Sequence, residues 1–138
     1  MSVEAFLDTN VLVYAVDGSP NSASKRSRAR ALIREQSFGT SAQVIQEFYW
    51  TVTRKLRKPL APSIAARWVD RLSSNELVPV DTVLVKSAIE GSIRWQISYW
   101  DAAIVAAAEA LGASTLYTED LNHGQLYGSV RAIDPFRE

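Results

Sequence analysis

The sequence has no cysteine, only one histidine and no long hydrophobic run. The absence of cysteine excludes disulfide bonds, thiolate metal sites and cysteine nucleophiles, and it agrees with a reducing compartment. No stretch approaches the roughly 20 apolar residues that span a bilayer, and no basic segment leads into an apolar one at the N-terminus. We therefore expect a cytoplasmic protein that does not contact the membrane.

The chain also lacks net charge, since 15 basic residues balance 15 acidic ones. Residues 1–69 nevertheless contain ten Lys and Arg against five acids, whereas residues 70–138 contain five against ten. A basic half can contact a polyanion while an acidic half holds cations, although solvated surfaces also differ by a few charges without functional cause. With 138 residues and 47% hydrophobic content, we expect a single domain over residues 1–138.

The stretch VEAFLDTNVLVYAV near the N-terminus predicts a buried strand followed directly by a helix. Asp8 lies where the strand would end, and Thr9 or Asn10 would cap the helix. In open parallel sheets, ligands bind at the carboxyl ends of the strands, so Asp8 is a candidate binding residue. The alternative is that Asp8 serves only as an acid at the start of a helix.

The rest of the chain predicts alternating helices and strands. The predicted strands are Phe38–Ser41, Leu77–Val80, Thr115–Thr118 and Val130–Ile133. The predicted helices are Lys25–Gln36, one that starts with a capping box at Thr40 and Gln43, Ile64–Leu72, Val83–Ile97 and Ser98–Leu111. This alternation predicts a three-layer α/β/α domain with a central, mainly parallel sheet of about four to five strands.

Glu47 is predicted to lie on the helix that follows the second strand. Apolar residues surround it at helical spacing, which places its side chain near the buried face. A carboxylate there needs a cation or a basic partner, for which Arg54 and Arg94 are candidates.

Two later segments bring further acids to the ends of predicted strands and the starts of helices. Asp101 has capping-box spacing from Ser98, and capping alone would also explain its presence. Glu119 and Asp120 directly follow a predicted strand. In a parallel sheet these acids can converge on Asp8, where their mutual repulsion would favour a bound divalent cation. Because all the ligands would be oxygen atoms, Mg²⁺ or Mn²⁺ is favoured over zinc.

Basic residues form two clusters that can contact phosphates or face solvent. One recurs every four residues along the predicted helix 25–36, and the other ends the helix that carries Glu47. The six residues are Arg26, Arg30, Arg34, Lys55, Arg57 and Lys58. Trp68 is interpreted as a packing residue and His123 as a turn residue.

Five segments carry a family resemblance, in the same order along nearly the whole chain. They are FLDTNVLVYA (6–15), SAQVIQEFYW (41–50), SYWDAAIVAAA (98–108), YTEDLNHGQ (117–125) and VRAIDPF (130–136). Together they resemble the PIN domain and, within it, the VapC-type toxins of bacterial toxin–antitoxin pairs.

The resemblance implies a Mg²⁺- or Mn²⁺-dependent endoribonuclease that acts on RNA as a toxin. The acidic quartet of the family falls on Asp8, Glu47, Asp101 and Asp120. The supporting positions are Thr9, Asn10, Ser98 and Glu119, of which Glu119 is a second acid that can face the metal. Glu47 would either ligate the metal or orient the attacking water. The family also implies a homodimer and a VapB-like antitoxin whose Arg or Lys would pair with the quartet.

Two other classes of function remain as alternatives. A metal-dependent phosphatase or a phospho-receiver also gathers acids at strand ends, but a receiver has paired acids after its first strand and a lysine near its last. This chain has Asp-Thr-Asn at the first position and no lysine after Lys86. The second alternative is a non-catalytic PIN-like binding module in which the acids only cap helices.

Overall fold

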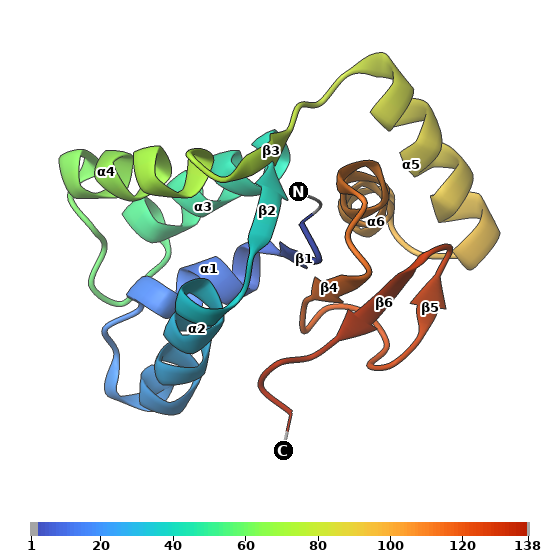
Figure 1. Ribbon diagram of the computed structural model, residues 1–138. Coiled ribbons are helices and arrows are strands. Elements are labelled where there is room, and N and C mark those ends of the chain that lie inside the picture. Colours follow the sequence, from blue (N-terminus) through green and yellow to red (C-terminus); the bar gives the residue numbers. More distant parts are fainter. Residues whose placement is uncertain (1–2, 138) are drawn as a thin grey trace.

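The structure is a computed structural model that describes residues 3–137 (Figure 1). Its strands are β1 (Ala5–Leu7), β2 (Phe38–Ser41), β3 (Glu76–Val78), β4 (Thr115–Tyr117), β5 (Leu126–Tyr127) and β6 (Val130–Ile133). Its helices are α1 (Thr9–Val16), α2 (Ala23–Glu35), α3 (Ala42–Arg54), α4 (Pro62–Ser73), α5 (Thr82–Trp95) and α6 (Tyr99–Leu111), with a 3-10 turn η1 (Pro20–Ser22). None of the helices in this range is long and apolar enough to cross a bilayer.

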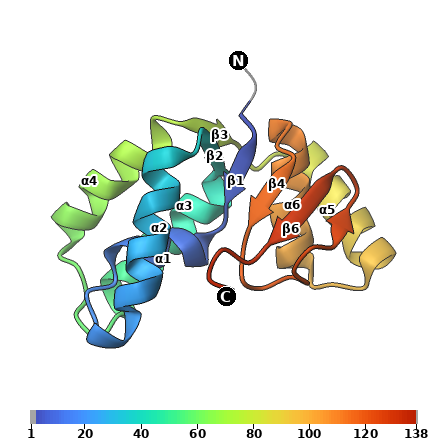
Figure 2. The ribbon, with the colours of Figure 1, turned by 60° about the horizontal axis from the view of Figure 1, so that its bottom comes forward.

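The strands form one sheet in the order β3-β2-β1-β4-β6-β5. Every neighbouring pair is parallel except β5 and β6. Helices α1 to α4 cover one face and α5 and α6 cover the other, as the two views in Figures 1 and 2 show. The predicted three-layer, mainly parallel architecture is therefore confirmed. From β1 the chain adds β2 and β3 on one side of the sheet, and it then adds β4, β6 and β5 on the other side. Parallel sheets of this kind bind ligands where the strand order reverses, which here is between β1 and β4.

The sheet has six strands within residues 3–137, so the predicted number of four to five was too low. The missed strand is β5, which has two residues and pairs antiparallel with β6. The turn between them contains Gly128 at a φ of +64°, a left-handed conformation that glycine adopts without strain. A strand of two residues is too short to produce an alternating pattern in the sequence.

Two helix caps lie one or two residues from their predicted positions. Asp8 itself caps α1, because its Oδ1 accepts a hydrogen bond from the Thr9 amide, whereas Thr9 or Asn10 was the predicted cap. Ser41, and not Thr40, caps α3. Both corrections have the same cause: the strand runs into the helix without a loop, so the last extended residue becomes the cap.

Helix α6 packs closely against the sheet. All seven residues from 102 to 108 are buried, and most are alanine. The close approach is also visible at Gly39 on β2, where an added Cβ would lie 2.6 Å from the Leu111 side chain and 2.9 Å from the Glu76 carbonyl oxygen. Small side chains at this contact allow α6 to lie close to the sheet, and the first turn of the helix then lies at the edge where β1 and β4 end.

Candidate active site

The acids predicted from the sequence lie around the carboxyl ends of β1 and β4. These strands are parallel neighbours, so Asp8 after β1 lies beside the segment 118–120 after β4. Helix α3 starts at the same edge, directly after β2, and carries Glu47. Helix α6 ends shortly before β4 begins, so its first turn, with Asp101, lies at the edge where β4 ends. Four segments that are distant in sequence therefore supply one carboxylate each.

Asp8 is the most buried of these acids, with 5% of its surface exposed. Its Oδ1 accepts a hydrogen bond from the Thr9 amide at 2.7 Å, and its Oδ2 accepts one from the Thr118 hydroxyl at 2.8 Å. Burial raises the pKa of Asp8 to about 7; the bonds from Thr118 and Thr9 oppose this rise, and the charges of Asp120 and Glu47 add to it. The ionised form is therefore costly unless a cation accompanies it. Neither of the two ion pairs found in residues 3–137 involves Asp8.

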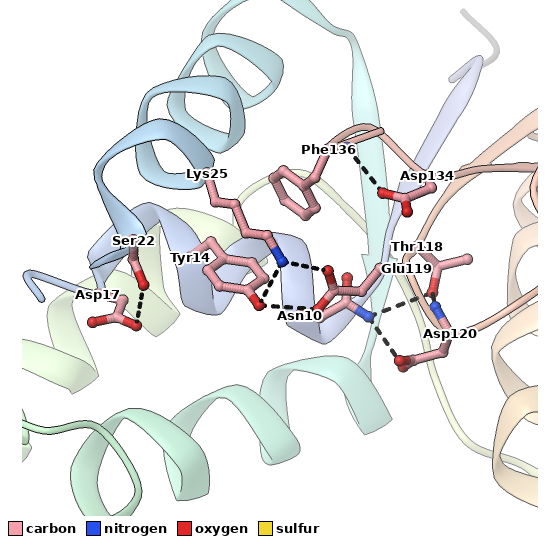
Figure 3. Close-up of polar contacts among 10 residues, drawn as sticks. All are labelled: Asn10, Tyr14, Asp17, Ser22, Lys25, Thr118, Glu119, Asp120, Asp134 and Phe136. Atoms are coloured by element: carbon pink, nitrogen blue, oxygen red, sulfur yellow. Dashed lines mark hydrogen bonds and ion pairs between the residues drawn. The ribbon is translucent and has the colours of Figure 1, made fainter. Parts of the chain in front are cut away.

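Thr118 links Asp8 to Asp120. Its buried hydroxyl oxygen accepts hydrogen bonds from the Asp120 amide at 3.1 Å and from Asn10 Nδ2 at 3.4 Å. The same Asn10 nitrogen donates to Asp120 Oδ2 at 3.0 Å, as Figure 3 shows. Asn10 Oδ1 is buried and has no hydrogen-bond partner among the described residues. The residue that bonds Asp120 thus also carries an unsatisfied amide oxygen, and hard divalent cations use amide and carboxylate oxygens as ligands.

Asp120 is subject to the charges of the other acids. Burial raises the pKa of Asp120, the hydrogen bond from Asn10 opposes this rise, and the charges of Asp101, Glu119 and Glu47 raise the pKa further. Asp101 is half-buried in the first turn of α6, where its amide donates to Ser98 Oγ at 3.0 Å, as the capping box predicts. The backbone of Asp101 therefore takes part in the helix cap at Ser98, while the charge of its side chain acts on Asp120.

Glu47 is exposed, whereas the apolar residues around it predicted a side chain near the buried face. The Thr9 hydroxyl donates to its Oε2 at 3.1 Å, and Gln43 Nε2 donates to its Oε1 at 3.1 Å. The basic residues considered as partners lie elsewhere: Arg54 stacks on Trp50, and Arg94 stacks on Trp95. Glu47 is thus held at the edge by neutral donors, which leave its negative charge uncompensated.

Glu119 has different partners from its neighbour Asp120. The Tyr14 hydroxyl donates to Glu119 Oε1 at 3.1 Å, and Lys25 Nζ forms an ion pair with Oε2 at 3.0 Å (Figure 3). Lys25 also donates to the Tyr14 hydroxyl at 3.1 Å. Hydrogen bonds to Tyr14 and Glu119 raise the pKa of Lys25, so its ammonium stays charged. Asp120 is therefore the member of this acidic pair that faces the other carboxylates.

The side chains at this edge fit a divalent cation that keeps several water ligands. No three His, Asp or Glu side chains within residues 3–137 are already gathered in a metal cluster. Mg²⁺, however, commonly uses only one or two protein carboxylates together with water. Asp8 and Asp120 are joined through a single hydroxyl group, and a hollow of about 380 Å³ lies beside them, lined in part by Asn10, Glu47 and Glu119.

The six basic residues proposed as phosphate contacts fall into two groups. Arg26 donates to the Asp17 carbonyl oxygen at 2.7 Å, and Arg30 Nε donates to that of Ala15 at 2.8 Å, so both attach α2 to the end of α1. Arg34 is exposed and lies 3.9 Å from Glu35. The remaining three are exposed in the connection after α3; they are Lys55, Arg57 and Lys58.

The sequence reasoning missed four residues that shape this edge. They are Tyr14, Lys25, Gln43 and Thr118. Thr118 had a signal, since a hydroxyl residue two positions before Asp120 is placed to bond the chain that follows. Gln43 also had one, because it lies four residues before Glu47 on a helix. Tyr14 and Lys25 had none, because their partner is about a hundred residues away.

A model of the PIN domain family matches residues 5–128. The chain belongs to the PIN-domain family. Among solved structures, it is similar to VapC20 of Mycobacterium tuberculosis, described as a sarcin-ricin loop cleaving toxin, with 21% identity, a TM-score of 0.67, and coverage of 85% of this chain and 90% of that chain. No curated protein matches the chain significantly.

Two further solved structures that the chain resembles are complexes. A toxin–antitoxin complex from Klebsiella pneumoniae has 15% identity and a TM-score of 0.71, and covers 96% of this chain and 98% of that one. VapBC2 from Rickettsia felis, bound to a DNA fragment from its promoter, has 20% identity and a TM-score of 0.63, and covers 93% of this chain and 96% of that one. At these identities the likeness establishes a shared PIN fold.

Proposed function

We propose that this PIN-domain protein is a Mg²⁺- or Mn²⁺-dependent endoribonuclease that acts as the toxin of a toxin–antitoxin pair. The observation that carries the proposal is the convergence of Asp8, Glu47, Asp101 and Asp120 on one sheet edge without a basic partner among the described residues. Carboxylates placed in this way repel one another, and a divalent cation removes the repulsion. The PIN fold and the similarity to a toxin described as cleaving the sarcin-ricin loop support RNA as the substrate.

Asp8 and Asp120 would hold the metal directly, with Asp101 completing the site from α6. When bound, the metal supplies an activated water molecule and neutralises charge that develops on the phosphodiester. Asn10 keeps Asp120 in place through its hydrogen bond to Oδ2 and offers its own unsatisfied Oδ1 to the site. Thr118 keeps Asp8 and Asp120 at a fixed separation.

Glu47 has a distinct role in this proposal. The hydrogen bonds from Thr9 and Gln43 fix both of its oxygen atoms on the exposed side of the group. We assign it to orient the attacking water and to accept its proton, because it is exposed, lines the hollow and accepts hydrogen bonds from the neutral side chains of Thr9 and Gln43. No side-chain nucleophile is required.

RNA would reach this edge over the exposed basic residues. Arg34, Lys55, Arg57 and Lys58 are free to contact phosphates, whereas Arg26 and Arg30 contribute mainly to the packing of α2. We also propose a VapB-like antitoxin, as in the complexes that share this fold, and a homodimer. An Arg or Lys from the antitoxin would inhibit the enzyme by pairing with the carboxylates in place of the metal.

The test compares the wild type with Asp101→Asn on a labelled single-stranded RNA, with Mn²⁺ and with EDTA. We expect cleavage only by the wild type with metal, because the site needs the Asp101 carboxylate, whereas the backbone amide of residue 101 still donates to the Ser98 cap of α6 in the variant. Asp70→Asn, which changes an exposed carboxylate on α4, is the matched control and should cleave normally. Sequencing of 5′ ends after induction of each variant in cells identifies the RNA.

The main alternative is a PIN-like binding module without catalytic activity. It predicts that calorimetry detects no Mn²⁺ binding and that the wild type and Asp101→Asn give the same RNA ends. The match to the PIN domain leaves no support for a phospho-receiver. Co-expression with the neighbouring gene product followed by mass measurement tests the antitoxin, and a chain that stays without a partner would contradict that part of the proposal.

A further inference from the structure

Tyr14, Lys25 and Glu119 form a closed ring of hydrogen bonds, which we call the Lys25 triad. Lys25 donates to Tyr14 at 3.1 Å and to Glu119 at 3.0 Å, and the Tyr14 hydroxyl donates to the second Glu119 oxygen at 3.1 Å. Each group in the ring thus contacts both of the others. The three residues come from α1, α2 and the segment after β4, so the ring joins three parts of the fold (Figure 3).

Aromatic rings fix the ammonium group of the triad. Lys25 Nζ lies 4.6 Å from the centroid of the Tyr14 ring and 5.4 Å from that of Phe136. The two rings pack edge to face with their centroids 5.0 Å apart. The negative faces of aromatic rings attract a cation, so Lys25 is held by charge as well as by hydrogen bonds. This makes the triad a defined structure and not a chance surface ion pair.

The triad determines the direction of one of two adjacent acids. Glu119 is directed to Tyr14 and Lys25, while Asp120 is directed to Asn10, whose Nδ2 donates to it at 3.0 Å. Of the two ion pairs found in residues 3–137, one joins Lys25 to Glu119 and the other is a surface contact on α2. The Lys25 ammonium group is therefore bound to Glu119, which is not one of the four acids of the proposed site. Those four acids have no basic partner among the described residues.

We propose that Lys25 and Tyr14 are positioning residues that keep Glu119 out of the metal site, so that Asp120 alone of this acidic pair faces the metal. The inference deepens the proposed function and depends on it. Glu119 lines the same hollow as Asp120 and Glu47, so a released Glu119 side chain has access to the site. As an additional carboxylate it would bind the metal more strongly and displace a water ligand, which would be unfavourable for a reaction that needs activated water.

The decisive variant is Lys25→Met, which keeps an unbranched side chain one atom shorter than that of lysine and removes the charge. We expect this variant to bind Mn²⁺ about five- to tenfold more tightly by calorimetry, because a nearby carboxylate loses its cation. The EPR spectrum of the bound Mn²⁺ should change, and RNA cleavage should become slower. Lys86→Met, at an exposed lysine on α5, is the matched control and should behave as the wild type.

Two further variants separate positioning from a general effect of charge. In Lys25→Met/Glu119→Gln both charges of the pair are absent. The Mn²⁺ affinity of this double variant should return to within about twofold of that of the wild type, and its EPR spectrum should match that of the wild type. Tyr14→Phe removes the hydroxyl that donates to Glu119 and changes no charge. It should shift the EPR spectrum in the same direction as Lys25→Met.

The possible outcomes distinguish this inference from the function on which it rests. If the wild type binds Mn²⁺ and all triad variants bind it with the same affinity and spectrum, the triad is only a structural connection and the inference is wrong. The inference is also wrong if the double variant keeps the altered affinity of Lys25→Met. If the wild type itself binds no Mn²⁺, the proposed function fails together with it. Should Lys25→Met not fold, Tyr14→Phe and Glu119→Gln decide by the same measurements.

Discussion

The buried carboxylate of Asp8 predicts an unusual dependence of stability on pH in the metal-free protein. Its pKa is about 7 in the folded state, against 3.8 in an unfolded chain, and burial is the main cause. Between these two values the folded protein holds a proton on Asp8 that the unfolded chain has lost. The free energy of unfolding therefore decreases as the pH rises through this window, in contrast to a carboxylate whose pKa is lowered by a salt bridge.

The size of the effect follows from the difference between the two pKa values. Each pKa unit corresponds to about 1.4 kcal/mol, so the rise from 3.8 to about 7 sets an upper limit of roughly 4 kcal/mol. The raised pKa of Asp120 acts in the same direction. The lowered pKa of Asp17 acts in the opposite direction, but its contribution is complete above about pH 5 because it titrates below its ordinary value.

Urea unfolding in EDTA, followed by tryptophan fluorescence between about pH 5 and 7.5, measures this slope. In Asp8→Asn most of the slope should disappear. At pH 7.5 this variant should be about 2 to 3 kcal/mol more stable than the wild type. Removal of the buried charge stabilises the variant by up to roughly 4 kcal/mol. The Thr118 hydroxyl, which donates to Asp8, loses a charged acceptor, and this loss offsets about 1 kcal/mol of the gain. Mn²⁺ should stabilise the wild type and not the variant.

The exposed-site variant Asp70→Asn is the control and should keep the wild-type slope. A wild-type protein whose stability in EDTA is constant or increases over this pH range would refute the reasoning. The reasoning would also be refuted if Asp8→Asn retained the full slope, since the proton would then be bound elsewhere.

Three other substitutions test particular contacts. Thr118→Val removes the hydroxyl group that joins the two strand ends and should lower the free energy of unfolding by about 2 to 3 kcal/mol in urea titrations, with weaker Mn²⁺ binding. Arg30→Ala should destabilise the protein by about 1 kcal/mol, because Arg30 loses its hydrogen bond to the Ala15 carbonyl oxygen. Arg34→Ala should leave stability unchanged. It should reduce the slope of RNA affinity against salt concentration, on logarithmic scales, by about one. Gly39→Ala should cost about 1 to 3 kcal/mol, seen as a lower Tm, because the new methyl group overlaps α6.

Much of the fold was predictable because its signals are local. Apolar runs bounded by polar residues marked β1, β2, β4 and β6, and the capping box at Ser98 correctly placed the start of α6. The strand β5 could not be predicted, since two residues carry no periodicity and its pairing depends on β6. The caps at Asp8 and Ser41 were displaced because pattern alone does not show where an extended residue ends and a helix begins.

The site was predictable only in part. The order of strands and helices was enough to predict that the acids could meet at one edge, because parallel strands end together. It did not show that Glu47 is exposed, since its neutral partners come from α1 and from its own helix. It also did not separate Glu119 from Asp120, because that distinction depends on Lys25, which is 94 residues away in the sequence.

The most direct test of the central claim is the position of the metal. Anomalous diffraction from crystals of the protein soaked in Mn²⁺ should show a peak about 2.1 Å from a carboxylate oxygen of Asp8 or Asp120, with Asp101 in the same coordination sphere and Glu119 still bonded to Lys25. A peak at another part of the surface, or no peak at this edge at a saturating concentration of Mn²⁺, would contradict the account.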